Sequence, residues 1–196
     1  MTERGFADAP VQSAHAFRAI MQAMARPGRV QAIDADVKAP APLLPSAAAV
    51  ALTLCDFQTP VWLSPRLRDE RIVHYLRFHA GAPLVAEPQA AQFVFATAAD
   101  LPPRLGLLAQ GTHEYPDRSA TLVIQVAGFV PGSVELSGPG IRGGERFGVV
   151  GLDEAFWTAM AENHARFPVG IDAIFAAPGK LAAVPRSTAI RMLESA

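Results

Sequence analysis

The stretch Thr121-Leu-Val-Ile-Gln-Val126 is a run of aliphatic and β-branched residues that lacks a polar-apolar alternation. Gln92-Phe-Val-Phe-Ala96 has the same character, and Gly170-Ile-Asp-Ala-Ile-Phe175 is a weaker third run that Asp172 interrupts. Strands of this kind are covered on both faces, as in a sheet packed between helices. The three runs therefore predict the centre of a buried sheet.

Helical patterns alternate with these runs, and a short strand is predicted at Thr59–Leu63. The alternation is typical of an α/β protein with a largely parallel sheet. Caps and breakers set the expected helix limits, for example Asp69 at a start and Pro168 after an end. Helices are predicted at residues 14–26, 46–56, 70–80, 101–110 and 153–167.

The first of these helices is expected to begin after Ser13 and to stop at Pro27-Gly28. Its apolar positions recur at helical spacing and predict a face turned towards the core: Phe17, Ile20, Met21 and Met24. Arg18, Gln22 and Arg26 fall on the other side. That side is either a solvated face or a surface that presents guanidinium groups to an anion.

Residues 133–137 alternate between polar and apolar side chains and lead through a glycine-rich segment to residues 146–150. Gly138-Pro-Gly-Ile-Arg-Gly143 matches the glycine pattern of dinucleotide-binding proteins, but a strand pattern follows it instead of a helix. We therefore predict a half-exposed antiparallel hairpin, and a sheet that is mixed overall.

Composition limits the classes of function. The chain has 196 residues, of which 51% are hydrophobic and 18% charged, so a single domain over residues 1–196 is expected, with residues 1–12 flexible. A formal net charge of -1 argues against nucleic acid as a partner. The absence of a signal peptide pattern and of any long apolar run predicts a cytoplasmic protein that does not enter a membrane.

Few residues offer catalytic chemistry. Cys55 is the single cysteine, so the chain alone cannot form a disulfide or hold an iron-sulfur cluster. Asp56 next to it would raise the pKa of the thiol, which favours a buried apolar role. The motifs of P-loop nucleotide hydrolases, serine hydrolases with G-x-S-x-G and H-E-x-x-H zinc proteases are absent.

The best local candidate for a site is the loop of residues 111–119, which contains His113, Asp117 and Arg118 and leads into a buried strand. A solvated connector shaped by its proline and aspartate explains the same composition equally well. Arginine makes up 15 of the 17 basic residues, which favours recognition of carboxylate or phosphate, although genomic base composition produces the same bias. Arg26 is the remaining candidate for contact with an anion.

Several segments, in order and at consistent spacing, resemble the family of H subunits of the bacterial carbon-phosphorus lyase core complex. Their order and spacing extend over most of the chain, from about Phe17 to Arg186, whereas Cys55 and Gln58 depart from the family pattern. The segments are Phe17-Arg-Ala-Ile-Met-Gln-Ala-Met-Ala-Arg-Pro-Gly28, Thr59-Pro-Val-Trp62, Phe78-His-Ala-Gly-Ala-Pro83, Gly111-Thr112, Ser119-Ala-Thr121, Leu136-Ser-Gly-Pro-Gly140 and Phe167-Pro-Val-Gly-Ile-Asp172.

The resemblance implies a three-layer α/β/α fold similar to the large domain of pyridoxal-phosphate-dependent transferases. It also implies a homodimer, and a core complex with the G, I and J subunits. With these partners the family is linked to exchange of the adenine of ATP for an alkylphosphonate, which gives ribose 1-phosphonate 5-triphosphate. Carbon-phosphorus bond cleavage is then expected to belong to a partner, because one cysteine cannot hold the cluster that radical cleavage needs.

We expect no bound pyridoxal phosphate and no other cofactor. A pyridoxal-phosphate enzyme needs a lysine for the Schiff base, whereas Lys38 lies in a proline-rich stretch and Lys180 follows Gly179 in a loop. Three hypotheses stay open: a structural and assembly subunit that is not catalytic alone, a subunit that contributes an anion site for a phosphonate or nucleotide, and an independent small-molecule enzyme on a pyridoxal-type scaffold.

Overall fold

The computed structural model describes residues 3–33, 36–101 and 104–193. Its centre is a six-stranded sheet with the order β1-β8-β7-β4-β3-β2. A separate three-stranded sheet has the order β6-β5-β9. The strands of the large sheet are β1 (Gln31–Ala32), β2 (Val61–Leu63), β3 (Phe93–Thr97), β4 (Thr121–Gln125), β7 (Asp172–Ala177) and β8 (Lys180–Val184), and those of the small sheet are β5 (Phe129–Ser137), β6 (Glu145–Val149) and β9 (Ala189–Met192).

The buried sheet that the apolar runs predict is confirmed. Strands β2, β3, β4 and β7 are parallel neighbours, and their residues form rows across the sheet. One row joins Phe95, Val123 and Ile174 on one face, and each of these residues is at most 1% exposed. Leu122 and the other residues next along each strand face the opposite side, as the two-residue period of a strand requires.

The sheet is mixed, but for a different reason from the predicted one. The hairpin of β5 and β6 forms its own antiparallel sheet with β9. The antiparallel members of the large sheet are β8 and β1, which the sequence analysis missed. The turn Pro178-Gly179 between β7 and β8 carried the signal for that hairpin.

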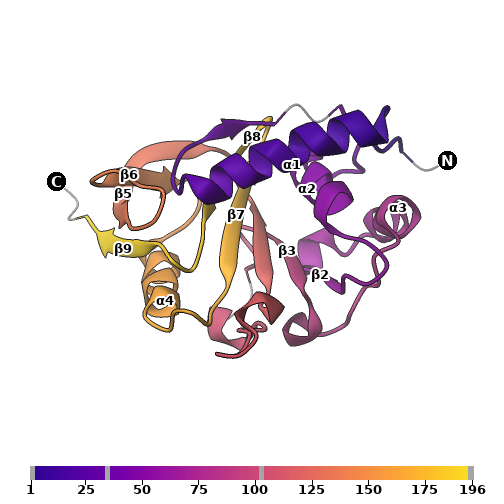
Figure 1. Cartoon of the computed structure of the whole chain (residues 1–196). Coiled ribbons are helices and arrows are strands. Elements are labelled where there is room, and N and C mark those ends of the chain that lie inside the picture. The colour runs from indigo at the N-terminus through magenta and orange to yellow at the C-terminus, as the bar shows by residue number, and fades with distance from the viewer. Residues whose placement is uncertain (1–2, 34–35, 102–103, 194–196) are drawn as a thin grey trace.

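Layers of packing lie on both faces of the large sheet (Figure 1). Helices α1 (Ala9–Ala25), α2 (Pro45–Leu54) and α3 (Glu70–Ala80) share an apolar core with one face. Helix α4 (Glu154–His164) and the inner side of the small sheet share the core of the other face. The chain is therefore an α/β protein in which the third layer combines a helix with a small sheet.

Helix α1 begins earlier than predicted. Asp8 caps it by accepting a hydrogen bond from the backbone of Val11, and Pro10 occupies the first turn, so Ser13 lies inside the helix. The first turn thus falls within the segment predicted to be flexible. In that segment the carbonyl oxygen of Glu3 also lies 2.8 Å from Nε2 of His79.

The inward face of α1 was predicted only in part. Ile20 is buried, but Phe17 and Met21 are about half exposed, at 49% and 51%. The buried positions are instead Ala16, Ile20 and Ala23. Small side chains let the helix lie close to α2 and β8, so the larger apolar residues of the neighbouring stripe remain at the surface.

The other helices follow the prediction with one exception. Asp69 caps α3 and Gly81 ends it in the left-handed conformation. Helix α2 is present and begins at Pro45, and Leu44 in the cap position donates its N–H to the side-chain oxygen of Gln125. The helix expected at residues 101–110 is wrong: apart from residues 102–103, which lie outside the described part, this segment holds only the 3₁₀ turn Leu105–Leu107.

The glycine-rich segment after β5 is the predicted hairpin turn, and it packs against the end of α1. Gly140 has φ +82°, and a Cβ at this position would collide with the backbone oxygen of Ala25. Gly28 has φ +80°, and a Cβ there would lie 2.9 Å from Leu136. Only glycine permits both the positive φ and the close approach, so these residues join the end of α1 to the small sheet.

Candidate functional site

The loop of residues 111–119 lies at the amino edge of the parallel strands, where β4 and β7 begin. His113, Asp117 and Arg118 are all exposed. The guanidinium carbon of Arg118 lies 4.2 Å from the ring centroid of Tyr115 in the same loop. Asp117 lines an open groove of about 450 Å³ at this edge, whereas neither His113 nor Arg118 does. The loop therefore contributes one carboxylate to a groove and no cation.

The basic group of this groove is Arg186, which the sequence analysis did not single out. Its guanidinium binds the carboxylate of Asp172, at 2.5 Å for the closest pair of atoms, and both side chains are more than four-fifths buried. It also donates to the backbone oxygen of Pro116 at 2.6 Å and to the hydroxyl of Ser119. These partners join the loop to the first residue of β7. The guanidinium of Arg186 is therefore occupied by structural hydrogen bonds and is not available to a ligand.

Arg26, the fourth candidate, lies in a different groove of about 600 Å³ between the end of α1 and the hairpin of β5 and β6. Arg29 and Arg146 line the same groove. None of the other three candidates lines it. The structure therefore does not bring the four predicted residues into one site.

A crevice of about 530 Å³ opens at the carboxyl edge of the sheet, where Thr97 ends β3 and Gln125 ends β4. Ligands of open α/β sheets commonly bind at this edge. Here, however, the side chain of Gln125 already has partners within the protein. Its oxygen accepts a hydrogen bond from the backbone N–H of Leu44 at 2.6 Å, and its amide nitrogen donates one to the backbone oxygen of Pro42 at 3.0 Å. Neither Lys38 nor Lys180 lines the crevice.

Asp100, just after Thr97, is also held by neighbours. Burial acts to raise the pKa of this carboxyl, but hydrogen bonds from Thr97 and from the backbone N–H of Arg66 outweigh it, so the pKa lies below its ordinary value. A carboxylate with a lowered pKa is a poor general base near neutral pH. The guanidinium of Arg66 has no hydrogen bond or ion pair within the described parts of the chain and is the crevice's free cation there.

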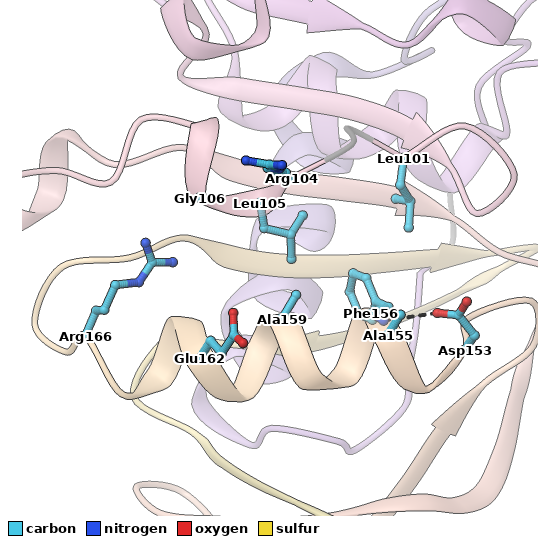
Figure 2. A pocket seen from close by; sticks show the side chains of 10 residues that line it. All are labelled: Leu101, Arg104, Leu105, Gly106, Asp153, Ala155, Phe156, Ala159, Glu162 and Arg166. Carbon is cyan, nitrogen blue, oxygen red and sulfur yellow. Dashed lines mark hydrogen bonds between the residues drawn. The ribbon is translucent and has the colours of Figure 1, made fainter.

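A third cavity, of about 540 Å³, lies between α4 and the segment that contains Arg104 and Leu105 (Figure 2). Leu105 and Phe156 point into it from opposite sides, and Arg166 and Asp153 lie at opposite ends (Figure 2). The charged lining residues are two arginines and two acids: Arg104, Arg166, Asp153 and Glu162. The cavity is therefore apolar in its interior and balanced in formal charge.

Other candidate groups have structural roles. His164 on α4 is part-buried and places Nδ1 2.9 Å from the carbonyl oxygen of Arg186. Cys55 is buried, as expected. Across residues 3–33, 36–101 and 104–193, no three His, Cys, Asp or Glu side chains are grouped to hold a metal ion. Within the same ranges, no helix is long and apolar enough to cross a bilayer.

Two buried groups that can lose a proton, the Cys55 thiol and the Tyr75 hydroxyl, predict how the stability of the fold depends on pH. Burial raises the pKa of the Cys55 thiol to about 12, with a further contribution from Asp56, and burial likewise raises the pKa of Tyr75 to about 12. The folded protein keeps both protons at pH values where the unfolded chain loses them. The resulting stability is complete below about pH 9 and is lost as the pH rises towards 12.

We therefore expect the urea midpoint to fall steadily between about pH 9 and 12. Cys55→Ala should flatten the lower part of this decline, and iodoacetamide should label the native thiol at pH 8 far more slowly than the thiol in urea. Rapid labelling of the native protein would contradict the assigned burial. A Cys55→Ala protein with an unchanged pH profile would contradict the raised thiol pKa.

The fold and its cavities define an α/β protein with open surface grooves, two of which are lined by arginines whose guanidinium groups have no partner among the described residues. Residues 4–191 match the family described as "Bacterial phosphonate metabolism protein (PhnH)", and the chain belongs to that family.

Two curated proteins are similar to it over nearly their whole length. One is "Alpha-D-ribose 1-methylphosphonate 5-triphosphate synthase subunit PhnH" of Rhizobium meliloti (strain 1021), 39% identical over 184 residues, which cover 93% of this chain and 92% of the relative. The other is "Putative C-P lyase subunit protein HtxG" of Stutzerimonas stutzeri, 34% identical over 206 residues, which cover 98% of this chain and 97% of the relative.

Proposed function

We propose that this chain is a subunit of the carbon-phosphorus lyase machinery and supports the step that joins an alkylphosphonate to the ribose triphosphate of ATP. The observation that carries the proposal is the correspondence over 92% of a relative named as a subunit of ribose 1-methylphosphonate 5-triphosphate synthase. The family match from residue 4 to residue 191 agrees with it.

We propose an assembly role in a cytoplasmic complex with the G, I and J subunits, in which the chain forms a homodimer and binds no cofactor. The surface of α1 supports the assembly role, because Val11, Phe17 and Met21 are each about half exposed. Large apolar side chains gathered on one exposed helix are typical of a protein interface. The exposed positions of Lys38 and Lys180, outside the carboxyl-edge crevice, support the absence of a pyridoxal phosphate Schiff base.

The likeness to the large domain of pyridoxal-phosphate transferases is also a proposal, and the parallel strands β2, β3, β4 and β7 between two packed layers support it. An independent enzyme on such a scaffold is the alternative. Genes for phosphonate transport and for the other lyase subunits beside the gene for this chain would favour the complex. A solitary gene, together with turnover by the purified chain, would favour the independent enzyme.

Reconstitution with and without the chain tests the proposal. We expect the G, I and J subunits alone to lose most of the conversion of ATP and methylphosphonate to the ribose 1-phosphonate product, measured by phosphorus NMR. Addition of the purified chain should restore it. A complex without the chain that is stable and fully active would refute the proposed role.

A matched pair of variants places the interface within the same assay. Met21→Glu puts a charge into the exposed apolar stripe of α1, and burying that charge against a partner is strongly unfavourable. Gln22→Glu adds the same charge at the neighbouring exposed position, about 100° around the helix from Met21 and off the line through Phe17 and Met21. We expect Met21→Glu alone to reduce co-purification with the other subunits, and equal recovery of the two variants would exclude this face of α1.

A further inference from the structure

The groove between the end of α1 and the small sheet is the most basic of the cavities described above. It is lined by Arg26, Arg29 and Arg146, and Glu145 is the acidic residue of its lining. We name it the arginine groove. The α4 cavity, by contrast, balances two arginines with two acids, and the carboxyl-edge crevice is lined by a single arginine.

The guanidinium groups of the arginine groove are largely available to a ligand. Those of Arg26 and Arg146 form no hydrogen bond or ion pair with any described residue. Arg29 approaches Glu145 only to 3.7 Å, and its side chain is more than half exposed. A long, exposed ion pair of this kind is weak, so Arg29 can turn to a stronger acceptor at little cost.

The scaffold fixes where the three cations stand. Arg26 caps the end of α1, and a backbone hydrogen bond of 3.1 Å from Arg29 to Arg26 closes the turn between them. Gly28 in this turn packs against Leu136 of β5. Arg146 projects from β6, where it lies opposite Glu135 of the antiparallel strand β5. The end of α1 and the hairpin of β5 and β6, two segments far apart in the sequence, thereby place arginines around one groove.

We propose that the arginine groove binds a polyphosphate group. Guanidinium groups bind phosphate oxygens in bidentate fashion, and three of them around one hollow match a chain of phosphates better than a single phosphonate. The apolar wall formed by Val30, Phe129 and Val130 offers a surface for the organic part of such a ligand. That the polyphosphate belongs to ATP or to the ribose 5-triphosphate product rests on the proposed function, whereas the binding itself does not.

Titration calorimetry on the full-length chain tests the proposal, with tripolyphosphate, ATP and methylphosphonate as separate ligands. We expect tripolyphosphate and ATP to bind and methylphosphonate to bind much more weakly. Arg26→Gln and Arg146→Gln should each weaken binding by about fivefold, as is usual for one exposed charged contact. Higher salt should weaken binding of both polyphosphates.

Arg104→Gln is the matched control, because it removes the same charge from the balanced α4 cavity. It should leave the affinity for tripolyphosphate unchanged, and thermal unfolding should show that all three variants fold. Absence of tripolyphosphate binding at low salt, or equal weakening by Arg104→Gln, would overturn the groove assignment. Preferred binding of methylphosphonate would overturn the polyphosphate class. If reconstitution showed that the chain has no role in the complex, the titrations would still measure whether the groove binds polyphosphate. The two proposals can therefore fail independently.

Discussion

Replacement of Asp172 by alanine is expected to lower the free energy of unfolding by about 3–5 kcal/mol. The carboxylate accepts hydrogen bonds from the backbone N–H of Arg186 at 2.9 Å and from its guanidinium at 2.5 Å and 3.1 Å. Both side chains are at most 16% exposed, so the variant leaves a buried guanidinium without its counter-charge. The thermal midpoint should fall by about 10 °C, measured by circular dichroism.

Two further variants separate the ion pair from a general effect of losing a carboxylate. Asp36→Ala breaks an exposed pair with Arg4, whose side chains are 64% and 50% exposed, and should cost about 0.5 kcal/mol or less. Joint replacement of Asp172 by leucine and Arg186 by methionine should recover most of the loss, because no buried charge remains. Similar losses of unfolding free energy for Asp172→Ala and Asp36→Ala would show that the buried ion pair stabilises the fold no more than the exposed one.

Part of the fold could be read from local sequence because local forces decide it. The buried strands β3, β4 and β7 carry apolar residues on both faces, and α3 has both a cap at Asp69 and a terminating Gly81. The start of α1 was misjudged because two polar residues, Asp8 and Ser13, are both suitable caps. Pro10 favours Asp8 as the cap, since proline is well suited to the first turn of a helix.

The periodicity of α1 did not predict which of its faces is buried, because Phe17 and Met21 are about half exposed. Phe17 and Met21 have helical spacing with Ile20, and a strongly apolar stripe is usually assigned to the core. The core of this chain instead accepts Ala16 and Ala23 beside Ile20, because the helix lies close to α2 and β8. Which stripe faces inward depends on the shape of the partner surface, and that surface is made by segments distant in the sequence.

The candidate site was predictable to a similar degree. Arg26 lines a basic groove, and Arg29 follows it in the next turn, but Arg146 joins them only because that turn packs against β5 and β6. Arg186 carried no local signal, because its partners Asp172 and Pro116 lie 14 and 70 positions away. The abundance of arginine thus indicated an affinity for anions, whereas the tertiary structure determines which arginines are available to bind one.

Replacement of Trp157 by alanine should be the most destabilising change in the core between the large sheet and α4. We expect it to lower the free energy of unfolding by about 3–5 kcal/mol. Trp157 is 1% exposed, and its ring lies within 6 Å of the rings of Phe147, Phe156 and Phe175, measured between centroids. Removal of the indole leaves a cavity among three rings that the sheet and α4 hold apart. Urea unfolding followed by circular dichroism measures the loss without relying on the deleted fluorophore.

Trp157→Phe is the informative companion, because the indole N–H has no hydrogen-bond partner among the described residues. Phenylalanine keeps an aromatic ring and removes this unsatisfied donor, so the loss should be less than half that of Trp157→Ala. Phe57→Ala, at a position that is 73% exposed, should change stability by about 0.5 kcal/mol or less. Equal losses for the alanine and phenylalanine variants would mean that the N–H has an acceptor after all. Because Phe147 also lines the arginine groove, Trp157→Ala should weaken polyphosphate binding even at temperatures where the variant remains folded.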